Sequence, residues 1–257
     1  MKFDRYMQES MQEITQNVTP DPMLRARIMN EVQMNRTKSR PRRMRFVLAA
    51  AAMVCVLATG ALAAGPIVGL YSSSSSYGDT QSLSDEAKME KKAGFLVRLP
   101  ETLGGAAFEN MSVDPIEAAD ADGNIVYSYK DFLASYVDGV TNPFLSVFEK
   151  KYETPSTLSE KTLVDTREID GITVTYRVIP ATFLPADGSI EPTAEERAEE
   201  ERGERFISYG TETRIDGLYH TIAWEQDGLS YSIGCSDGNW TTEDFFTAAE
   251  DVIHTAP

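Results

Sequence analysis

The sequence predicts an α+β protein: an N-terminal helical hairpin, one transmembrane helix, and an extracytoplasmic antiparallel sheet with a C-terminal helix packed on it. Three observations carry this prediction. Apolar residues recur every three or four positions near the N-terminus, an uncharged run of 25 residues follows, and alternating apolar residues punctuated by Asp-Gly fill the later chain. The predicted parts are a cytoplasmic helical segment 1–45, a transmembrane helix 46–70, a Ser-rich linker with a short helix 71–94, and an α+β domain 95–257.

The N-terminal segment predicts two short amphipathic helices, the second opening with Asp21 as N-cap and Pro22 at the first helical position. Two such helices cannot bury both apolar stripes alone. Either they pack on each other and on the inner membrane leaflet, or a cytosolic protein covers them by helix-in-groove packing. The second reading predicts a partner-binding set drawn from both stripes: Met7, Met11, Ile14, Leu24, Ile28 and Val32.

The uncharged run predicts a membrane anchor with a defined orientation. At about 1.5 Å per residue its helix can cross a hydrocarbon core of about 30 Å. Basic residues precede the run and none follows before Lys88, which predicts a cytoplasmic N-terminus and an extracytoplasmic C-terminal domain in the cell envelope. The topology-determining residues are Arg40, Arg42, Arg43 and Arg45.

A cleaved signal peptide is the competing interpretation, because Ala61-Leu62-Ala63 fits the small-x-small cleavage pattern. The 45 residues before the run are long for the basic region of such a peptide, and their periodicity indicates folded helices. We therefore expect a retained anchor in contact with membrane lipid.

Charge and cysteine usage agree with two environments. Residues 1–45 hold 10 basic and 5 acidic residues, whereas residues 71–257 hold 14 and 35. The strongly acidic outer part disfavours nucleic-acid binding, so no nucleic-acid partner is expected. Cys55 lies in the run and Cys235 is the only cysteine after it, which excludes an intrachain disulfide in the outer part.

The outer part predicts β-hairpins at Asp-Gly turns. Asp170-Gly171 and Asp227-Gly228 each lie between alternating apolar segments. Taking Asp216-Gly217 as another such turn predicts a three-stranded antiparallel meander. In that register one aromatic row crosses the meander, buried under the C-terminal helix through Phe245 or Val252, and consists of Tyr209, Trp224 and Tyr231.

Three helices are predicted in the outer part. One begins with Ser84 as N-cap, and a highly charged one begins near Thr193 and has almost no apolar face, which predicts a solvent-exposed excursion. The last begins at Glu243, capped by Thr241 or Thr242.

Candidate chemistry is sparse. No metalloprotease, phosphate-loop, nucleophile-elbow or dinucleotide motif occurs, and we expect no enzyme activity, no cofactor and no metal site. The Asp227-Gly228 register places His220 opposite Cys235, which can be a thiol–imidazole pair but shares its face with apolar residues, favouring a structural role. The stretch from Asp120 to Asn124 lacks the spacing of a calcium loop and predicts a turn.

The arrangement resembles bacterial single-pass regulators of the anti-sigma-factor type. The closing segment "YHTIAWEQDGLSYSIGCSDGNWTTEDFFTAAEDVI" is similar to the end of an uncharacterised extracytoplasmic domain of such proteins, matching at Trp224, Gly228 and Tyr231. The resemblance implies an extracytoplasmic sensing or binding domain with an unknown ligand, and a cytosolic sigma factor as partner of residues 1–45. Residues 1–45 contain no His or Cys, which excludes the zinc-binding form, and the segment is short for a complete sigma-binding domain. The alternative is an envelope binding or scaffold module without a cytosolic regulatory partner.

Overall fold

The computed structural model describes residues 67–72, 78–97, 99–120, 124–152, 158–185, 187–236 and 238–255. The strands are β1 (Ile67–Ser72), β2 (Thr102–Leu103), β3 (Ala106–Asp120), β4 (Ile125–Val137), β5 (Phe144–Glu149), β6 (Leu163–Ile169), β7 (Ile172–Pro185), β8 (Phe206–Thr211), β9 (Ile215–Gln226) and β10 (Leu229–Ser236). The helices are α3 (Glu86–Ala93), α4 (Ala194–Glu201) and α5 (Thr242–Thr255), with 3-10 turns η1 (Leu83–Asp85), η2 (Lys150–Tyr152) and η3 (Glu160–Thr162).

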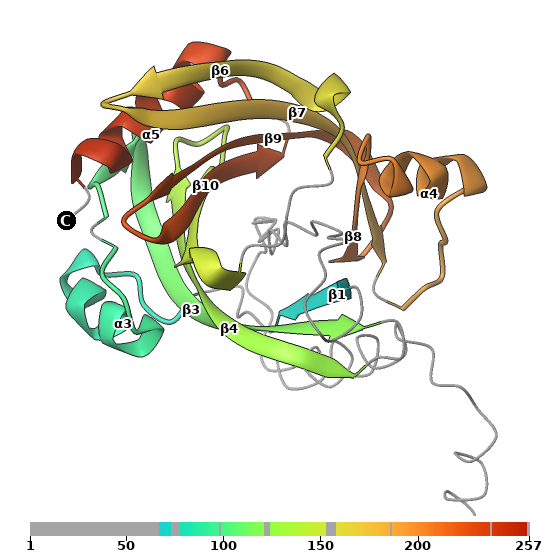
Figure 1. The fold of residues 1–257 in the computed structure, drawn as a ribbon, viewed down its shortest axis with the longest axis horizontal. Helices are drawn as coiled ribbons and strands as arrows, with labels where there is room; N and C mark the ends of the chain where they lie inside the picture. The colour runs from blue at the N-terminus through green and yellow to red at the C-terminus, as the bar shows by residue number, and fades with distance from the viewer. Residues whose placement is uncertain are drawn as a thin grey trace, which may run out of the picture.

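One strongly curved, mainly antiparallel sheet organises the described residues. Its strand order is β1-β3-β4-β5-β10-β9-β7-β6, with β2 added to β3 and β8 added to β7. α5 and α3 lie outside the curve, and α4 extends from its far side (Figure 1). The mixed fold with a C-terminal helix on an antiparallel sheet is therefore confirmed. The predicted N-terminal hairpin lies outside the described residues.

Two Asp-Gly turns form the predicted hairpins. Asp170 and Asp227 have φ of 50° and 51°, and the glycines that follow have φ of 82° and 78°. Positive φ at both central positions is the geometry of the type I′ turn, whose twist matches that of paired strands. The resulting register sets Trp224 opposite Tyr231 and His220 opposite Cys235, as the sequence predicted.

The predicted meander is wrong at its first strand. β8 pairs with β7 in parallel, and Tyr209 lies opposite Leu184. Asp216-Gly217 lies inside β9 rather than in a turn. Gly217 has no positive φ, and the Asp216 carboxylate accepts a hydrogen bond from the Thr182 hydroxyl on β7. Because β9 pairs with β7 through this stretch, Tyr209 cannot join the aromatic row.

The outer face of the sheet carries the larger apolar core. Alternate residues of β3, β4, β5, β10, β9 and β7 pack there against α5 and α3. α5 covers this face with a continuous apolar stripe of buried residues: Phe245, Phe246, Ala248, Ala249, Val252 and Ile253. Trp224 is 4% exposed and stacks on Tyr231 at 5.3 Å between ring centroids, so this part of the predicted row is confirmed as buried.

The inner face carries a smaller apolar cluster where the sheet curves towards itself. It consists of Phe144, Ile179, Ala181, Phe183, Phe206 and Tyr219. Gly234 permits this approach, because a Cβ there would lie 2.2 Å from the Tyr219 hydroxyl. Along part of their length, the strands that carry this cluster are therefore covered by apolar side chains on both faces of the sheet.

The C-terminal end of the predicted transmembrane segment is strand, not helix. Residues 67–70 form the first part of β1, which pairs antiparallel with β3 from Ile67↔Asp120 to Ser72↔Ile116. Gly65-Pro66 and the strand-compatible sequence "IVGL" explain why a helix does not continue here. Within the described part of the chain, no helix is long and apolar enough to span a membrane, and residues 46–66 lie outside it.

Helices α4 and α5 begin within one residue of the predicted positions, and of the two predicted caps the one at α5 is confirmed. Thr193 and Glu196 form a reciprocal capping box at α4, and Thr241 accepts a hydrogen bond from the Asp244 backbone at α5. α3 differs, because Ser84 lies within the preceding 3-10 turn and Asp85 occupies the N-cap. Met89 of α3 is buried in the outer core, so this short helix packs against the sheet.

Candidate functional site

The predicted partner-binding and topology-determining residues, from Met7 to Arg45, lie outside the described residues. At the ends of β3 and β4, the Asp120 carboxylate accepts hydrogen bonds from the backbone and side-chain nitrogens of Asn124 at 2.9 and 3.2 Å, and residues 121–123 between them lie outside the described residues. Among the described residues, no group of three or more His, Cys, Asp or Glu side chains is placed to hold a metal ion.

The His220–Cys235 pair lies under α5 on the outer face. His220 Nδ1 is 2.7 Å from the Tyr176 hydroxyl, and the imidazole is parallel to the Phe245 ring at 5.7 Å. Cys235 is fully buried, and burial raises the pKa of Tyr176 to about 12. A buried thiol beneath an aromatic lid has no access for a substrate, so this cluster is packing with a polar link between strands.

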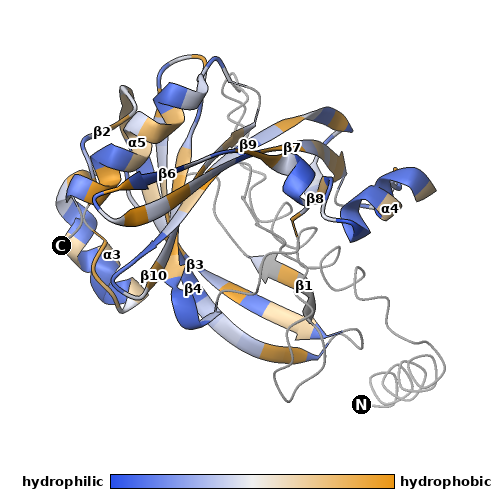
Figure 2. Cartoon of the chain, turned by 45° about the horizontal axis from the view of Figure 1, so that its top comes forward, coloured by the Kyte–Doolittle hydropathy of each residue, from blue (hydrophilic) through white to orange (hydrophobic). Residues whose placement is uncertain are grey.

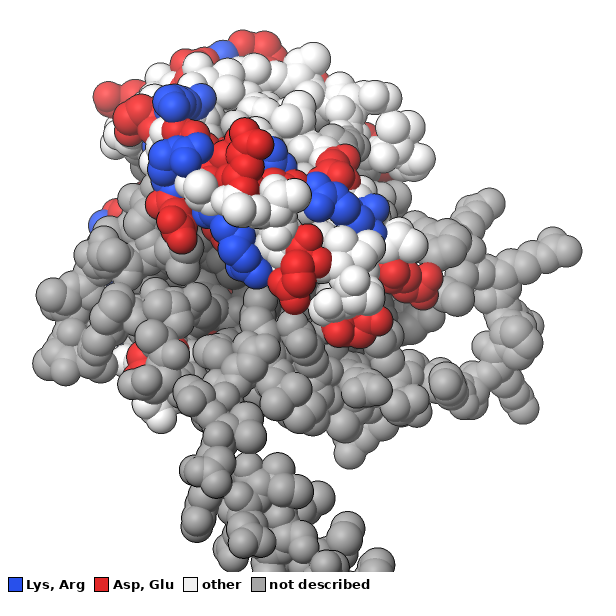
Figure 3. Space-filling model, turned by 90° about the vertical axis from the view of Figure 1, so that its right-hand side faces the viewer, with Lys and Arg blue, Asp and Glu red and all other residues white. Residues whose placement is uncertain are grey.

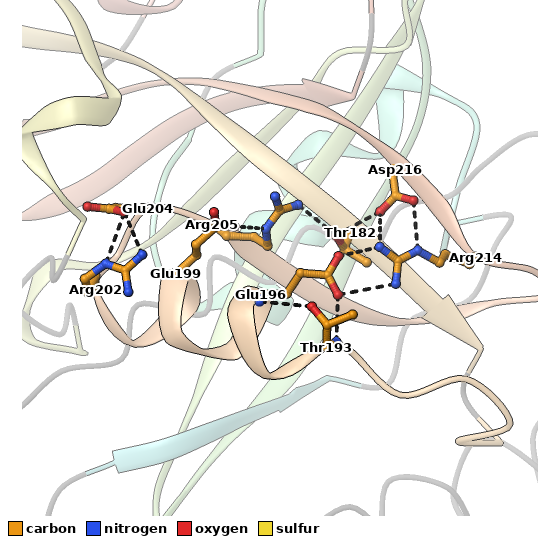
Figure 4. A network of polar contacts seen from close by, with 9 residues as sticks. All are labelled: Thr182, Thr193, Glu196, Glu199, Arg202, Glu204, Arg205, Arg214 and Asp216. Carbon is orange, nitrogen blue, oxygen red and sulfur yellow. Dashed lines mark hydrogen bonds and ion pairs between the residues drawn. The ribbon is translucent and has the colours of Figure 1, made fainter.

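An ion-pair network holds α4 against the sheet (Figure 4). Arg214 on the segment before β9 donates to both Glu196 of α4 and Asp216 of β9. Arg205 donates to Glu199 at 2.6 Å and to Thr182 at 3.0 Å. Charge-assisted hydrogen bonds therefore replace the missing apolar face of this hydrophilic helix (Figure 2).

The solvent-exposed face of this network has no patch of uniformly positive or uniformly negative charge. Basic and acidic side chains alternate over it in the space-filling view (Figure 3). The Arg214 hydrogen bond, with those at Thr193, lowers the pKa of Glu196 to about 2. A carboxylate so fully satisfied by its own chain is structural, and a ligand would have to compete with these contacts.

The inner face of the sheet holds a second, different polar group. It consists of four serine hydroxyls and two carboxylates, all of them buried and all on β-strands. We call it the inner polar patch: Ser112, Asp114, Asp131, Ser146, Ser230 and Ser232. The register brings these side chains from β3, β4, β5 and β10 to one face: Asp114↔Asp131, Ser146↔Ser232.

Both carboxylates of the inner polar patch are held by hydroxyls rather than by cations. Asp131 accepts from the Ser146 hydroxyl at 2.8 Å, and Asp114 accepts from the Ser112 hydroxyl at 3.3 Å. Burial raises the pKa of Asp131 to about 8 and that of Asp114 to about 6, and the proximity of the two acids adds to the rise at Asp131. At neutral pH the two therefore share about one proton.

An aromatic group borders the inner polar patch. Phe148 follows Val147, the register partner of Phe132, and so lies beside Asp131. Tyr129 lies two residues before Asp131 on the same face of β4 and meets Phe148 at 5.3 Å between centroids. Tyr152 and Tyr127 continue the stack, and all four rings are only partly buried. The patch thus has an aromatic border that reaches solvent.

Sequence reasoning missed the inner polar patch, although its signal was present. In "LSYSIGC" the serines alternate with apolar residues, which predicts one buried and one solvated face. Ser230 and Ser232 are instead buried, because the sheet curves and encloses its polar face.

The inner polar patch can accept hydrogen bonds and bind positive charge. Among the described residues, this patch brings together buried polar side chains from four strands, and none of them forms an ion pair. Its chemistry is that of recognition: two carboxylates, hydroxyls and bordering rings. Searches of protein-family models, curated proteins and solved structures found no match to this chain.

Proposed function

We propose that the chain is a membrane-anchored protein whose extracytoplasmic α+β domain senses or binds a ligand, and whose inner segment regulates a cytosolic partner in the manner of an anti-sigma factor. The observation that carries this proposal is the sequence asymmetry about one uncharged run. Five cations between Lys38 and Arg45 precede the run, and the next basic residue is Lys88.

The described fold supports a close coupling between anchor and domain. β1 begins at Ile67, and the Gly65-Pro66 pair before it ends the apolar helix near Ala64, three residues earlier. Three extended residues reach at most about 11 Å. In the proposed topology the edge of the sheet is therefore held at the outer membrane surface, and the Ser-rich stretch follows β1 instead of separating it from the membrane.

Protease treatment of intact spheroplasts tests the topology. The full chain carries a tag at each end. We expect loss of the C-terminal tag and protection of the N-terminal one, and protection of the C-terminal tag would overturn the proposal. A mature N-terminus at Ala64 would identify cleavage and remove the anchor from the proposal.

Co-purification of cytosolic proteins with the full chain tests the regulatory partner. Leu24→Asp or Ile28→Asp is expected to abolish a specific interaction at unchanged membrane level, because each places a charge in the apolar stripe. Asn30→Asp adds the same charge off the stripe and serves as the control. Recovery of no specific cytosolic protein with the parent chain would favour the alternative, an envelope binding or scaffold module that is only anchored by its inner segment.

A further inference from the structure

The acid pair of the inner polar patch lacks a cationic partner among the described residues. Asp114 and Asp131 are opposite each other on β3 and β4 and are 4% and 6% exposed. Lys92 acts on Asp114 electrostatically but forms its ion pair with Asp79. Glu225, further along the same face, is paired with Lys150. A buried pair of acids with no counter-charge is a costly arrangement that a bound cation would relieve.

Ser232 supplies an independent observation. Ser232 is only 8% exposed, yet its side-chain hydroxyl has no hydrogen-bond partner. Ser232 lies directly opposite Ser146 on the inner face, and Ser146 donates to Asp131. Buried hydroxyls are usually paired, so the Ser232 hydroxyl, one of six unpartnered buried side-chain atoms among the described residues, leaves an open hydrogen-bonding position near the acid pair.

The aromatic border selects among cations. Among the described residues, no group of three or more acidic, His or Cys side chains is placed to hold a metal ion. Phe148 and Tyr129, in contrast, present rings next to Asp131, which suits the stem of an organic cation and adds cation–π attraction. An ammonium group also matches the acceptors, because it has three donors and no acceptor of its own.

We propose that the inner polar patch binds the ammonium group of an organic amine, with the Asp131 carboxylate and the Ser232 hydroxyl as acceptors, Asp114 as additional negative charge, and Phe148 and Tyr129 against the apolar stem. The proposal rests on the binding role proposed above and names the ligand class. Anionic and purely apolar ligands are disfavoured by the same groups.

Calorimetry on the purified full chain tests this assignment, with n-butylammonium as probe and n-butanol as the uncharged control. We expect butylammonium to bind and butanol not to bind. Asp131→Asn and Asp114→Asn are each expected to weaken amine binding at least about tenfold, because each removes a carboxyl group that is ionised when the ammonium is bound. Glu168→Gln makes the same change at an exposed site and is expected to bind as the parent does.

Proton release is the second readout. An ammonium beside Asp131 favours its ionised form, so binding below pH 8 releases a proton, and the measured heat depends on the ionisation enthalpy of the buffer. Affinity is expected to rise roughly 25-fold from pH 6.5 to pH 8.5, in step with the ionised fraction of Asp131. Asp114 and Tyr219 also interact electrostatically with Asp131, and Asp79 and Lys92 interact with Asp114. Asp131→Asn is expected to abolish the buffer dependence.

Ser232→Ala separates a ligand contact from a structural role. It is expected to stabilise the free protein, because it removes an unpaired hydroxyl, and to weaken amine binding. Absence of binding up to about 10 mM amine, equal binding of butanol, or unchanged affinity in the Asp131→Asn and Ser232→Ala variants would overturn the assignment. Each of these results leaves the topology and co-purification tests untouched, so the two proposals fail separately.

Discussion

Trp224→Ala probes whether the stacked pair on the outer face is core. Burying a Trp removes about 150–250 Å² from water, which at about 25 cal/mol per Å² corresponds to about 4–6 kcal/mol. The indole Nε1 of Trp224 is buried without a hydrogen-bond partner, and removing it returns about 1–3 kcal/mol. The expected net loss in the free energy of unfolding is about 2–4 kcal/mol.

Trp224→Phe separates these two contributions. It keeps a ring against Tyr231 and eliminates the unpaired donor, so its expected cost is below about 1.5 kcal/mol. Urea unfolding followed by the fluorescence of Trp240, the second of two tryptophans, measures both variants. A Trp224→Ala cost below about 1 kcal/mol would refute the burial argument. Equal costs for Ala and Phe would show that the nitrogen, not the ring, matters.

Three further predictions concern pH and packing. Glu196→Gln is expected to cost about 1–2 kcal/mol at pH 7, with Glu195→Gln as the exposed control. Because the pKa of Glu196 is lowered to about 2, its stabilisation is present above about pH 4.5 and is lost as the pH falls towards 2, which acid unfolding measures. Asp131 acts in the opposite direction: with its pKa raised to about 8, the folded state binds the extra proton, so its contribution to stability falls by about 1.4 kcal/mol per pH unit between about pH 5 and 8. Asp131→Asn should remove that slope in urea titrations, and an unchanged slope would contradict the assignment. Gly234→Ala is expected to cost about 1–3 kcal/mol in thermal unfolding, since its Cβ would collide with Tyr219 and Phe144; no cost would show that the inner cluster is loosely packed.

Local turn chemistry was readable from sequence, whereas strand partners far apart in the chain were not. Asp170-Gly171 and Asp227-Gly228 behave as predicted because both residues of each turn adopt positive φ. Asp216-Gly217 has the same letters but lies in a strand, where β7 supplies hydrogen-bond partners that no local pattern reveals. The parallel pairing of β8 with β7 likewise depends on where the α4 connection returns the chain.

The candidate site was hidden for a related reason. Alternation correctly divided β10 into an apolar face with Tyr231 and a polar face with Ser232. Whether a polar face meets solvent depends on curvature, which arises from the whole set of strands and from close contacts such as that at Gly234. The carboxylates of Asp114 and Asp131 come from different strands, so neither forms a motif with the other in sequence.

The position of β10 between β5 and β9 also sets the order in which the protein can be completed. β5 pairs with β10 from Glu149↔Leu229 to Phe144↔Gly234, so roughly 80 residues separate the closest partners. Ribosomes add about 5–20 residues per second, and the β5 edge therefore waits about 4–16 s for its neighbour. During that time the β3–β4–β5 ladder presents an unpaired strand flanked by apolar side chains, as open strand edges do in aggregation. A nascent chain that ends before Leu229 therefore leaves the β5 edge without its partner strand.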